Sequence, residues 1–293
     1  RTHVNTWIKK KVEHGYGKAT IHTMHDVLAS IFKAAVLDNV RGATPCVRIT
    51  NLPPRPTRSN KKQKWLPTQL QVMALVRAVA PRFQLAILIA AGCGLRLGEV
   101  LGLTVEDIDF TNRTVRVRRQ LSIECTCGDA CMQTTKSPSS VRDVRMPVPV
   151  AEAAKAHIAA GYVRTLTMTD HTAQVEPGEP AAKRAMRVMF TTAAGKPVPR
   201  SSWSLLWCTA VRTAGKILAE APRGRQGFTT HTLRHLFGSR LMANGATLVE
   251  VQEAMGHANP TVTANEYMWP TGQDRSLDLV DKAFSDDETD VAA

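Results

Sequence analysis

Apolar residues recur at helical spacing between Thr20 and Asp38. The members of this stripe are Ile21, Met24, Leu28, Ile31, Phe32 and Ala35. Intervals of three and four residues place them on one face, so we expect a core helix that begins at Thr20. Residues 4–11 have the pattern of the end of an earlier helix, and we expect its partners upstream of Arg1. The chain is therefore expected to hold part of a small helical domain over residues 1–52.

The helical pattern stops at residues 53–64. Pro53, Pro54 and Pro56 are followed by a polar, basic run that ends at Lys64. Proline lacks the amide proton that a helix interior needs, and so polar a run offers little to a core. We expect a linker between two domains here, which agrees with a length of 293 residues.

Helical patterns return after the linker and predict a larger domain over residues 65–273. Thr68 is the expected N-cap of its first helix, and Thr247 with Glu250 forms a capping box before a later one. The other expected helices cover residues 151–160, residues 202–218 and the stretch of Leu233, Leu236, Phe237 and Leu241, which Asn244 and Gly245 close.

Few segments have the pattern of strands. Apolar and basic residues alternate over residues 114–118, and residues 141–148 have the pattern of an antiparallel partner across a long hairpin. Residues 165–182 show no clear period, and we expect a loop there. The expected fold class is mainly α with a small antiparallel β-sheet, an α+β fold.

The formal charge of +13 is unevenly distributed along the chain. Residues 1–64 contain 13 Lys and Arg against 3 Asp and Glu, whereas residues 274–293 contain 7 acidic residues against 2 basic ones. Release of counterions from phosphates would give a surface of the first kind affinity for a polyanion. A basic protein without such a partner is the alternative.

The sequence gives no sign of a membrane segment. Its longest apolar run, residues 85–95, is too short to span a bilayer, and the first residues lack the pattern of a secretory signal. We therefore expect a cytoplasmic protein.

The six cysteines do not suggest a disulfide framework in so long a chain. Cys125, Cys127 and Cys131 are spaced so that thiolates could bind zinc, but no fourth ligand is evident nearby in the sequence. Reduced loop thiols are the favoured interpretation, and we expect no metal and no cofactor.

Several polar residues near the end of the chain have the types that phosphate chemistry uses. His231 and Arg234 lie three apart on a predicted helix, so their side chains leave one face a turn apart. Gly256 and His257 end the next helix, and Tyr267 follows ten residues later. Each alone has an ordinary structural explanation, as a core histidine, a salt-bridge arginine or a packing tyrosine.

The order of these motifs resembles that of the tyrosine recombinases, the phage-type integrase family. The matching segments are residues 92–103 around Arg96, the hairpin residues 135–142 with Lys136, residues 230–235, residues 255–257 and Tyr267. Ser137 stands where the family pattern has threonine. The resemblance nominates six catalytic residues: Arg96, Lys136, His231, Arg234, His257 and Tyr267.

The resemblance implies a recombinase that cleaves and rejoins DNA through a 3′-phosphotyrosyl intermediate, without metal or ATP. Arg96 and Arg234 would hold the non-bridging oxygens, because guanidinium groups bind phosphates bidentately. His231 is the expected base for Tyr267, and Lys136 the expected acid for the leaving 5′ oxygen. His257 would donate a hydrogen bond to the phosphate.

The resemblance also implies partners. These are double-stranded DNA attachment sites, a homotetramer on two synapsed duplexes and accessory DNA-bending proteins, at the nucleoid of a bacterial or phage-infected cell. Residues 1–52 would be part of a DNA core-binding domain. Within the acidic tail, residues 274–293, Leu277, Val280 and Phe284 predict a short amphipathic helix. It can fold back on its own domain or dock on a neighbouring protomer, and we favour the neighbour.

Two other functions are considered. A type IB topoisomerase uses a similar set of residues to nick and reseal one duplex, but the helical domain before a proline linker favours recombination. A non-catalytic DNA-binding regulator would fit the charge, but not six polar residues in family order.

Overall fold

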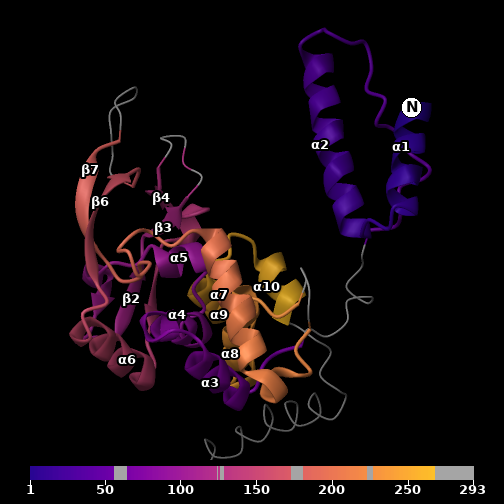
Figure 1. The fold of residues 1–293 in the computed structure, drawn as a ribbon. Helices are drawn as coiled ribbons and strands as arrows, with labels where there is room; N and C mark the ends of the chain where they lie inside the picture. Colours follow the sequence, from indigo (N-terminus) through magenta and orange to yellow (C-terminus); the bar gives the residue numbers. More distant parts are fainter. Residues whose placement is uncertain (56–64, 124, 126–128, 173–180, 223–226, 268–293) are drawn as a thin grey trace, which may run out of the picture. The chain divides into compact units, whose positions relative to one another are not determined.

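The computed structural model describes residues 1–55, 65–123, 125, 129–172, 181–222 and 227–267. The chain divides into two compact units, residues 1–63 and 64–293 (Figure 1). Within the described ranges, no helix is both long enough and apolar enough to cross a membrane.

The first unit is a pair of helices, α1 (Thr2–Glu13) and α2 (Lys18–Leu37). Both predicted helices are present, but the second begins at Lys18 with Gly17 as its N-cap and not at Thr20. Val4, Ile8 and Ile21 form their small buried core. The prediction of a core helix holds only for the first half of α2, because Ile31 is 59% exposed.

The second unit is built around helix α4 (Pro81–Gly92), which contacts four other helices: α3 (Gln69–Ala78), α5 (Leu97–Leu101), α6 (Val148–Ala159) and α8 (Thr230–Ala243). Side chains on all sides of α4 are buried, among them Leu85, Ile87 and Ile89. Among the described residues of this unit, the other helices are α7 (Arg200–Thr213), α9 (Leu248–Met255), α10 (Pro260–Tyr267) and the short 3-10 helices η2 (Val105–Asp107), η3 (Pro138–Ser140) and η4 (Gly215–Leu218).

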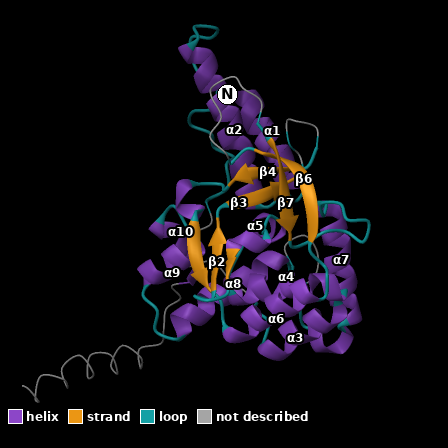
Figure 2. Cartoon of the chain, turned by 90° about the vertical axis from the view of Figure 1, so that its left-hand side faces the viewer, coloured by secondary structure: helices purple, strands orange, loops and turns teal. Residues whose placement is uncertain are grey.

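Two small sheets complete this unit (Figure 2). The first joins β1 (Ile108–Asp109), β2 (Thr114–Val117) and β5 (Arg142–Arg145) in antiparallel order. The predicted pairing of the alternating strand with its return partner is confirmed, with Val115 opposite Val144. The second sheet has the order β3 (Arg119–Ser122), β4 (Cys131–Thr134), β6 (Arg164–Asp170) and β7 (Lys183–Val188).

The α+β class is confirmed, but two details of the sequence reading are wrong. Residues 165–170 belong to strand β6 rather than to a loop, and β6 pairs with β4 in parallel. Its period is hidden because the buried residues at its end include the polar Thr169 and Asp170. The helix expected over 202–218 ends at Thr213, because Gly215 adopts a left-handed conformation with φ of 56°.

Helix α5 lies so close to β3 that one position accepts only glycine. A Cβ at Gly102 would lie 2.7 Å from the backbone nitrogen of Leu121, which cannot move without distorting β3. We expect Gly102→Ala to lower the free energy of unfolding by about 1–3 kcal/mol, as overpacking does. Urea denaturation measures the change.

Gly98→Ala, inside α5, is the matched control for Gly102, which directly follows this helix. Its Cβ would meet the Leu121 carbonyl oxygen at 3.4 Å, an ordinary contact, so its stability should stay within about 1 kcal/mol of the parent or rise. Equal losses in the two variants would contradict the close approach at Gly102.

Candidate active site

Glu99 is a buried carboxylate in α5, with only 1% of its surface exposed. Its Oε1 accepts a hydrogen bond from Arg96 Nη1 at 2.6 Å, and its Oε2 accepts one from Arg142 Nη2 at 2.9 Å. Arg234 Nη1 lies 4.0 Å from the same Oε2. Burial on its own would raise the pKa of Glu99, but the charges and hydrogen bonds of Arg142 and Arg96 outweigh it and lower that pKa. Glu99 is therefore an ionised anchor for three arginines.

The same three guanidinium groups bind consecutive carbonyl oxygens at the C-terminal end of α9. Arg142 donates to Ala254, Arg234 to Met255 and Arg96 to Gly256. The last carbonyls of a helix lack intrahelical partners and carry partial negative charge, so cations stabilise them. Three segments that are distant in sequence thus converge on one helix end.

Two glycines with positive φ make this convergence possible. Gly94 has φ of 66°, and a Cβ there would lie 2.3 Å from the Phe237 ring. Its carbonyl oxygen accepts a hydrogen bond from Arg234 Nη1 at 2.6 Å. Gly256, with φ of 62°, caps α9, and a Cβ there would lie 3.0 Å from the Ser139 carbonyl oxygen. Only glycine suits both positions without strain.

The segment after β4 is joined to this cluster through serines. Ser140 Oγ accepts a hydrogen bond from Arg96 Nη1 at 3.1 Å and lies 2.9 Å from Ser137 Oγ. Lys136 directly precedes Ser137 and is exposed to solvent. Lys136 was expected on a hairpin, but it lies in the connection from β4 of one sheet to β5 of the other. This connection is hydrogen-bonded to the predicted arginine, Arg96.

The two predicted histidines lie in different surroundings. His257 directly follows the capping Gly256, and its Nδ1 lies 2.8 Å from the hydroxyl of the buried Thr263. His231, in the first turn of α8, is exposed, and its ring contacts that of His235 edge-on at 4.6 Å between centroids. His257 is thus held beside the arginine cluster.

Tyr267 is the last residue of α10, a helix that packs against α8 and α9. Its side chain lies outside the described part of the chain, as does the acidic tail of residues 274–293. The backbone therefore places Tyr267 on a helix that contacts α8, which bears Arg234, and α9, which His257 follows.

The structure brings most of the nominated residues into one region, at different depths. The Arg96 side chain is 26% exposed, whereas that of Arg234 is 1% exposed. His231 and Arg234 were expected to leave one face of their helix together, yet one is exposed and the other buried.

Sequence reasoning missed Glu99 and Arg142 as parts of the site. The sequence did not single out Glu99, although this carboxylate is buried. The available signals were local: Glu99 stands three residues after Arg96, and Arg142 ends the hairpin motif. Neither reveals a pairing across 43 residues.

The cluster carries an excess of positive charge. Arg96, Arg142 and Arg234 bring three guanidinium groups to a single carboxylate, Glu99. Fixed donors of this kind stabilise an anion such as a phosphate group without reorganisation. The fold and the cluster together define an α+β protein with a site suited to phosphate.

The cysteines considered as zinc ligands are not part of this cluster. Cys125 and Cys131 lie together with His171, which the sequence analysis did not nominate, around β4 and the end of β6. Cys127 lies outside the described residues.

Comparison with known proteins identifies the family. The sequence pattern of the Phage integrase family matches residues 67–273, so the chain belongs to this family. That match covers the region from α3 to beyond Tyr267.

Individual relatives are more distant. The chain is 27% identical over 281 residues to "Tyrosine recombinase XerC-like" of Caldanaerobacter subterraneus subsp. tengcongensis, covering 90% of this chain and 66% of the relative. It is 26% identical over 271 residues to "Transposase from transposon Tn916" of Enterococcus faecalis, covering 90% and 62%. The chain spans about half to two thirds of the length of the curated relatives it matches.

Solved structures share the fold. The integrase of the Tn1549 transposon, in complex with a circular intermediate DNA, is 23% identical with a TM-score of 0.72, covering 94% of this chain and 83% of that one. A lambda integrase dimer bound to a core site has a TM-score of 0.55 at 12% identity, covering 92% and 81%.

The ionised Glu99 gives a prediction for stability. Glu99→Gln removes a buried charge that pairs with Arg96 and Arg142, and we expect it to lower the free energy of unfolding by about 3–5 kcal/mol at neutral pH. Glu106→Gln, which breaks an exposed pair with Arg187, should cost less than about 1 kcal/mol. Urea denaturation compares the two variants with the parent.

The loss of stability in Glu99→Gln should also depend on pH. Because the pKa of Glu99 is lowered from its ordinary 4.5 in the folded protein, its stabilising effect is complete above that value. It is lost as the pH falls through the folded-state pKa, so the difference between parent and Glu99→Gln should narrow in acid. A difference that stays constant down to the acid transition would contradict an ionised Glu99.

Proposed function

We propose that the protein is a site-specific DNA recombinase that cleaves and rejoins strands through a 3′-phosphotyrosyl intermediate. The observation that carries this proposal is the net positive charge of the arginine cluster around Glu99, in a chain of the phage integrase family. A tyrosine recombinase and DNA-bound integrases among its relatives support it.

In the proposed reaction the phenolate oxygen of Tyr267 attacks the phosphorus of one phosphodiester. The bond from phosphorus to the 5′ oxygen breaks, and Lys136 gives that oxygen a proton. The phosphate stays on the 3′ end and is now esterified to Tyr267. Since this ester preserves the bond energy, a 5′ hydroxyl from another duplex can reverse the step and complete strand transfer without ATP.

The cluster supplies the electrostatic part of catalysis. Arg96 is accessible and can donate to a non-bridging oxygen while keeping its bond to Glu99, because a guanidinium group has five N–H donors. Arg234 is buried, so it contacts the phosphate only if the surface above it opens; until then it contributes positive charge from below. His257 is proposed to donate to the phosphate and His231 to accept the proton of Tyr267.

DNA binding is assigned to both units. Residues 1–52 form part of a core-binding domain and residues 53–64 a basic linker, in a stretch of 13 Lys and Arg against 3 acidic residues. Residues 65–273 form the catalytic domain. Together they would hold a double-stranded attachment site.

Assembly follows from the chemistry. Exchange of two strands on each of two duplexes needs four tyrosines, so we propose a homotetramer on synapsed DNA, in which the tail of residues 274–293 docks on the next protomer. Accessory DNA-bending proteins would assist synapsis. The proposed setting is the bacterial cytoplasm, at the nucleoid.

The nucleophile can be tested with a nicked suicide substrate, whose short 5′ product diffuses away and traps the covalent adduct. We expect Tyr267→Phe to abolish the adduct, because only the attacking hydroxyl is lost. Denaturing gels detect the adduct, and mobility shifts should show nearly unchanged affinity for duplex DNA. A normal adduct yield in Tyr267→Phe would exclude this residue as the nucleophile.

The same preparation separates recombination from the topoisomerase alternative. A recombinase should form adducts only on its attachment site and exchange strands between two duplexes. Efficient relaxation of a supercoiled plasmid without that site would favour the topoisomerase, and the absence of any adduct would favour a non-catalytic DNA-binding regulator.

We propose Lys136 as the general acid from the family resemblance, which its exposure on the β4–β5 connection, hydrogen-bonded to Arg96, supports. Lys136→Ala should slow cleavage of ordinary DNA by about 10²–10⁴-fold. A 5′-phosphorothiolate substrate should restore the rate, because its sulfur leaves without a proton. Lys155→Ala, on the surface of α6, is the control. Failure of the sulfur substrate to rescue Lys136→Ala would assign the proton to another group.

A further inference from the structure

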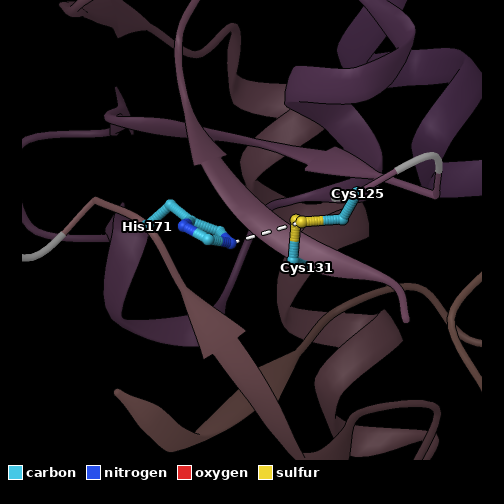
Figure 3. A group of neighbouring side chains, drawn as sticks. All are labelled: Cys125, Cys131 and His171. Carbon is cyan, nitrogen blue, oxygen red and sulfur yellow. Dashed lines mark hydrogen bonds between the residues drawn. The ribbon is translucent and has the colours of Figure 1, made fainter. Parts of the chain in front are cut away.

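We propose that Cys125, Cys131 and His171 bind a zinc ion that fastens the β3–β4 connection to the end of β6. These three residues come from different parts of the second unit, 46 positions apart in the case of Cys125 and His171. Their ligand atoms all lie within 4.8 Å of one another (Figure 3). The site is separate from the arginine cluster and goes beyond the proposed recombination chemistry.

The distances suit a single metal ion. Zinc bonds of about 2.3 Å to sulfur and 2.0–2.1 Å to nitrogen place tetrahedral ligands about 3.5–3.8 Å apart. Cys125 Sγ lies 3.2 Å from His171 Nε2, close to that separation. The sticks in Figure 3 show the Cys125 side chain extending toward the His171 ring and the Cys131 sulfur directed at the Cys125 sulfur.

The ligand types narrow the choice of metal. Two thiolates and one imidazole form a soft donor set that favours zinc over magnesium or calcium, which prefer oxygen. Gln133 Nε2 lies 3.8 Å from Cys125 Sγ, and such an N–H group stabilises a thiolate. Cys131 is fully buried, so its sulfur is shielded from water.

The sequence alone offered no evident fourth ligand beside the cysteines, and the fold supplies His171. It lies directly after β6, whose parallel pairing with β4 brings Thr169 opposite Cys131. The backbone nitrogen of His171 also donates to the Met132 carbonyl oxygen at 2.8 Å. The described residues thus provide three ligands, and the fourth position of a tetrahedral ion is available to water or a further side chain.

A bound zinc would strengthen the short pairing between β4 and β6. The parallel pairing between β4 and β6 covers only two residue pairs. A metal ion that bridges Cys131, at the start of β4, and His171, just beyond β6, would hold the two strands in register. Structural zinc sites of this kind contribute directly to stability.

The test measures metal content in the full chain carrying Tyr267→Phe and no polyhistidine tag, after zinc loading and dialysis against metal-free buffer. We expect about one zinc per chain by elemental analysis. Cys125→Ser, Cys131→Ser and His171→Ala should each retain less than a tenth of it. His171→Cys preserves a ligand and should keep the metal, and so should Cys208→Ser, which alters an exposed cysteine on α7.

Two further measurements keep the outcome clear if a variant folds poorly. Cobalt loading of the parent should give the near-ultraviolet thiolate-to-cobalt band of a tetrahedral site, weaker in Cys125→Ser. A chelator should lower the Tm of the parent but not that of His171→Ala. Substoichiometric zinc in the loaded parent would overturn the proposal. So would a Cys125–Cys131 disulfide, detected by mass spectrometry in protein purified with a reducing agent. Because Tyr267→Phe cannot form the adduct, the result does not depend on recombination.

Discussion

The ion cluster around buried Glu99 is the interaction on which the rest of the site depends. A carboxylate removed from water is costly unless charges and hydrogen bonds compensate it, and here Arg96 and Arg142 do so from different segments. Their remaining donors bind the carbonyls that end α9, and Arg234 binds the carbonyl between them. One charge therefore sets the relative positions of α5, β5, α8 and α9.

This arrangement links the fold to the substrate. Three guanidinium groups share one carboxylate, and the carbonyl dipoles of α9 offset part of the excess. A net positive charge therefore remains where Arg96 is partly exposed and His257 follows α9, and this charge needs an anion. A phosphate would satisfy that need, so the interactions that stabilise the cluster also suit it to the proposed DNA substrate.

What the sequence could predict was local. Thr68 and Thr247 cap their helices as expected, each in a capping box, because capping depends on residues within one turn. The nomination of Arg96, Lys136 and His257 rests on the order of motifs along the chain, and their catalytic roles stay predictions. Strand β6 was not predicted, because its buried end is polar and its parallel partner, β4, lies far away in sequence. The Glu99–Arg142 ion pair and the contact of Cys125 with His171 were not predicted either. Periodicity carries no information on contacts across 43 or 46 residues.

Lys136 follows β4 directly after Thr135, and the two ends of β4 have different contacts. Beyond the strand, Ser137 and Ser140 are hydrogen-bonded toward Arg96, while at its start Cys131 lies beside His171. Lys136 itself stays exposed between these attachments. A general acid must reach a leaving oxygen within hydrogen-bond distance, so a lysine on an unanchored loop would spend much of its time elsewhere. Anchoring the strand on either side restricts where Lys136 can lie, as its proposed role of general acid requires.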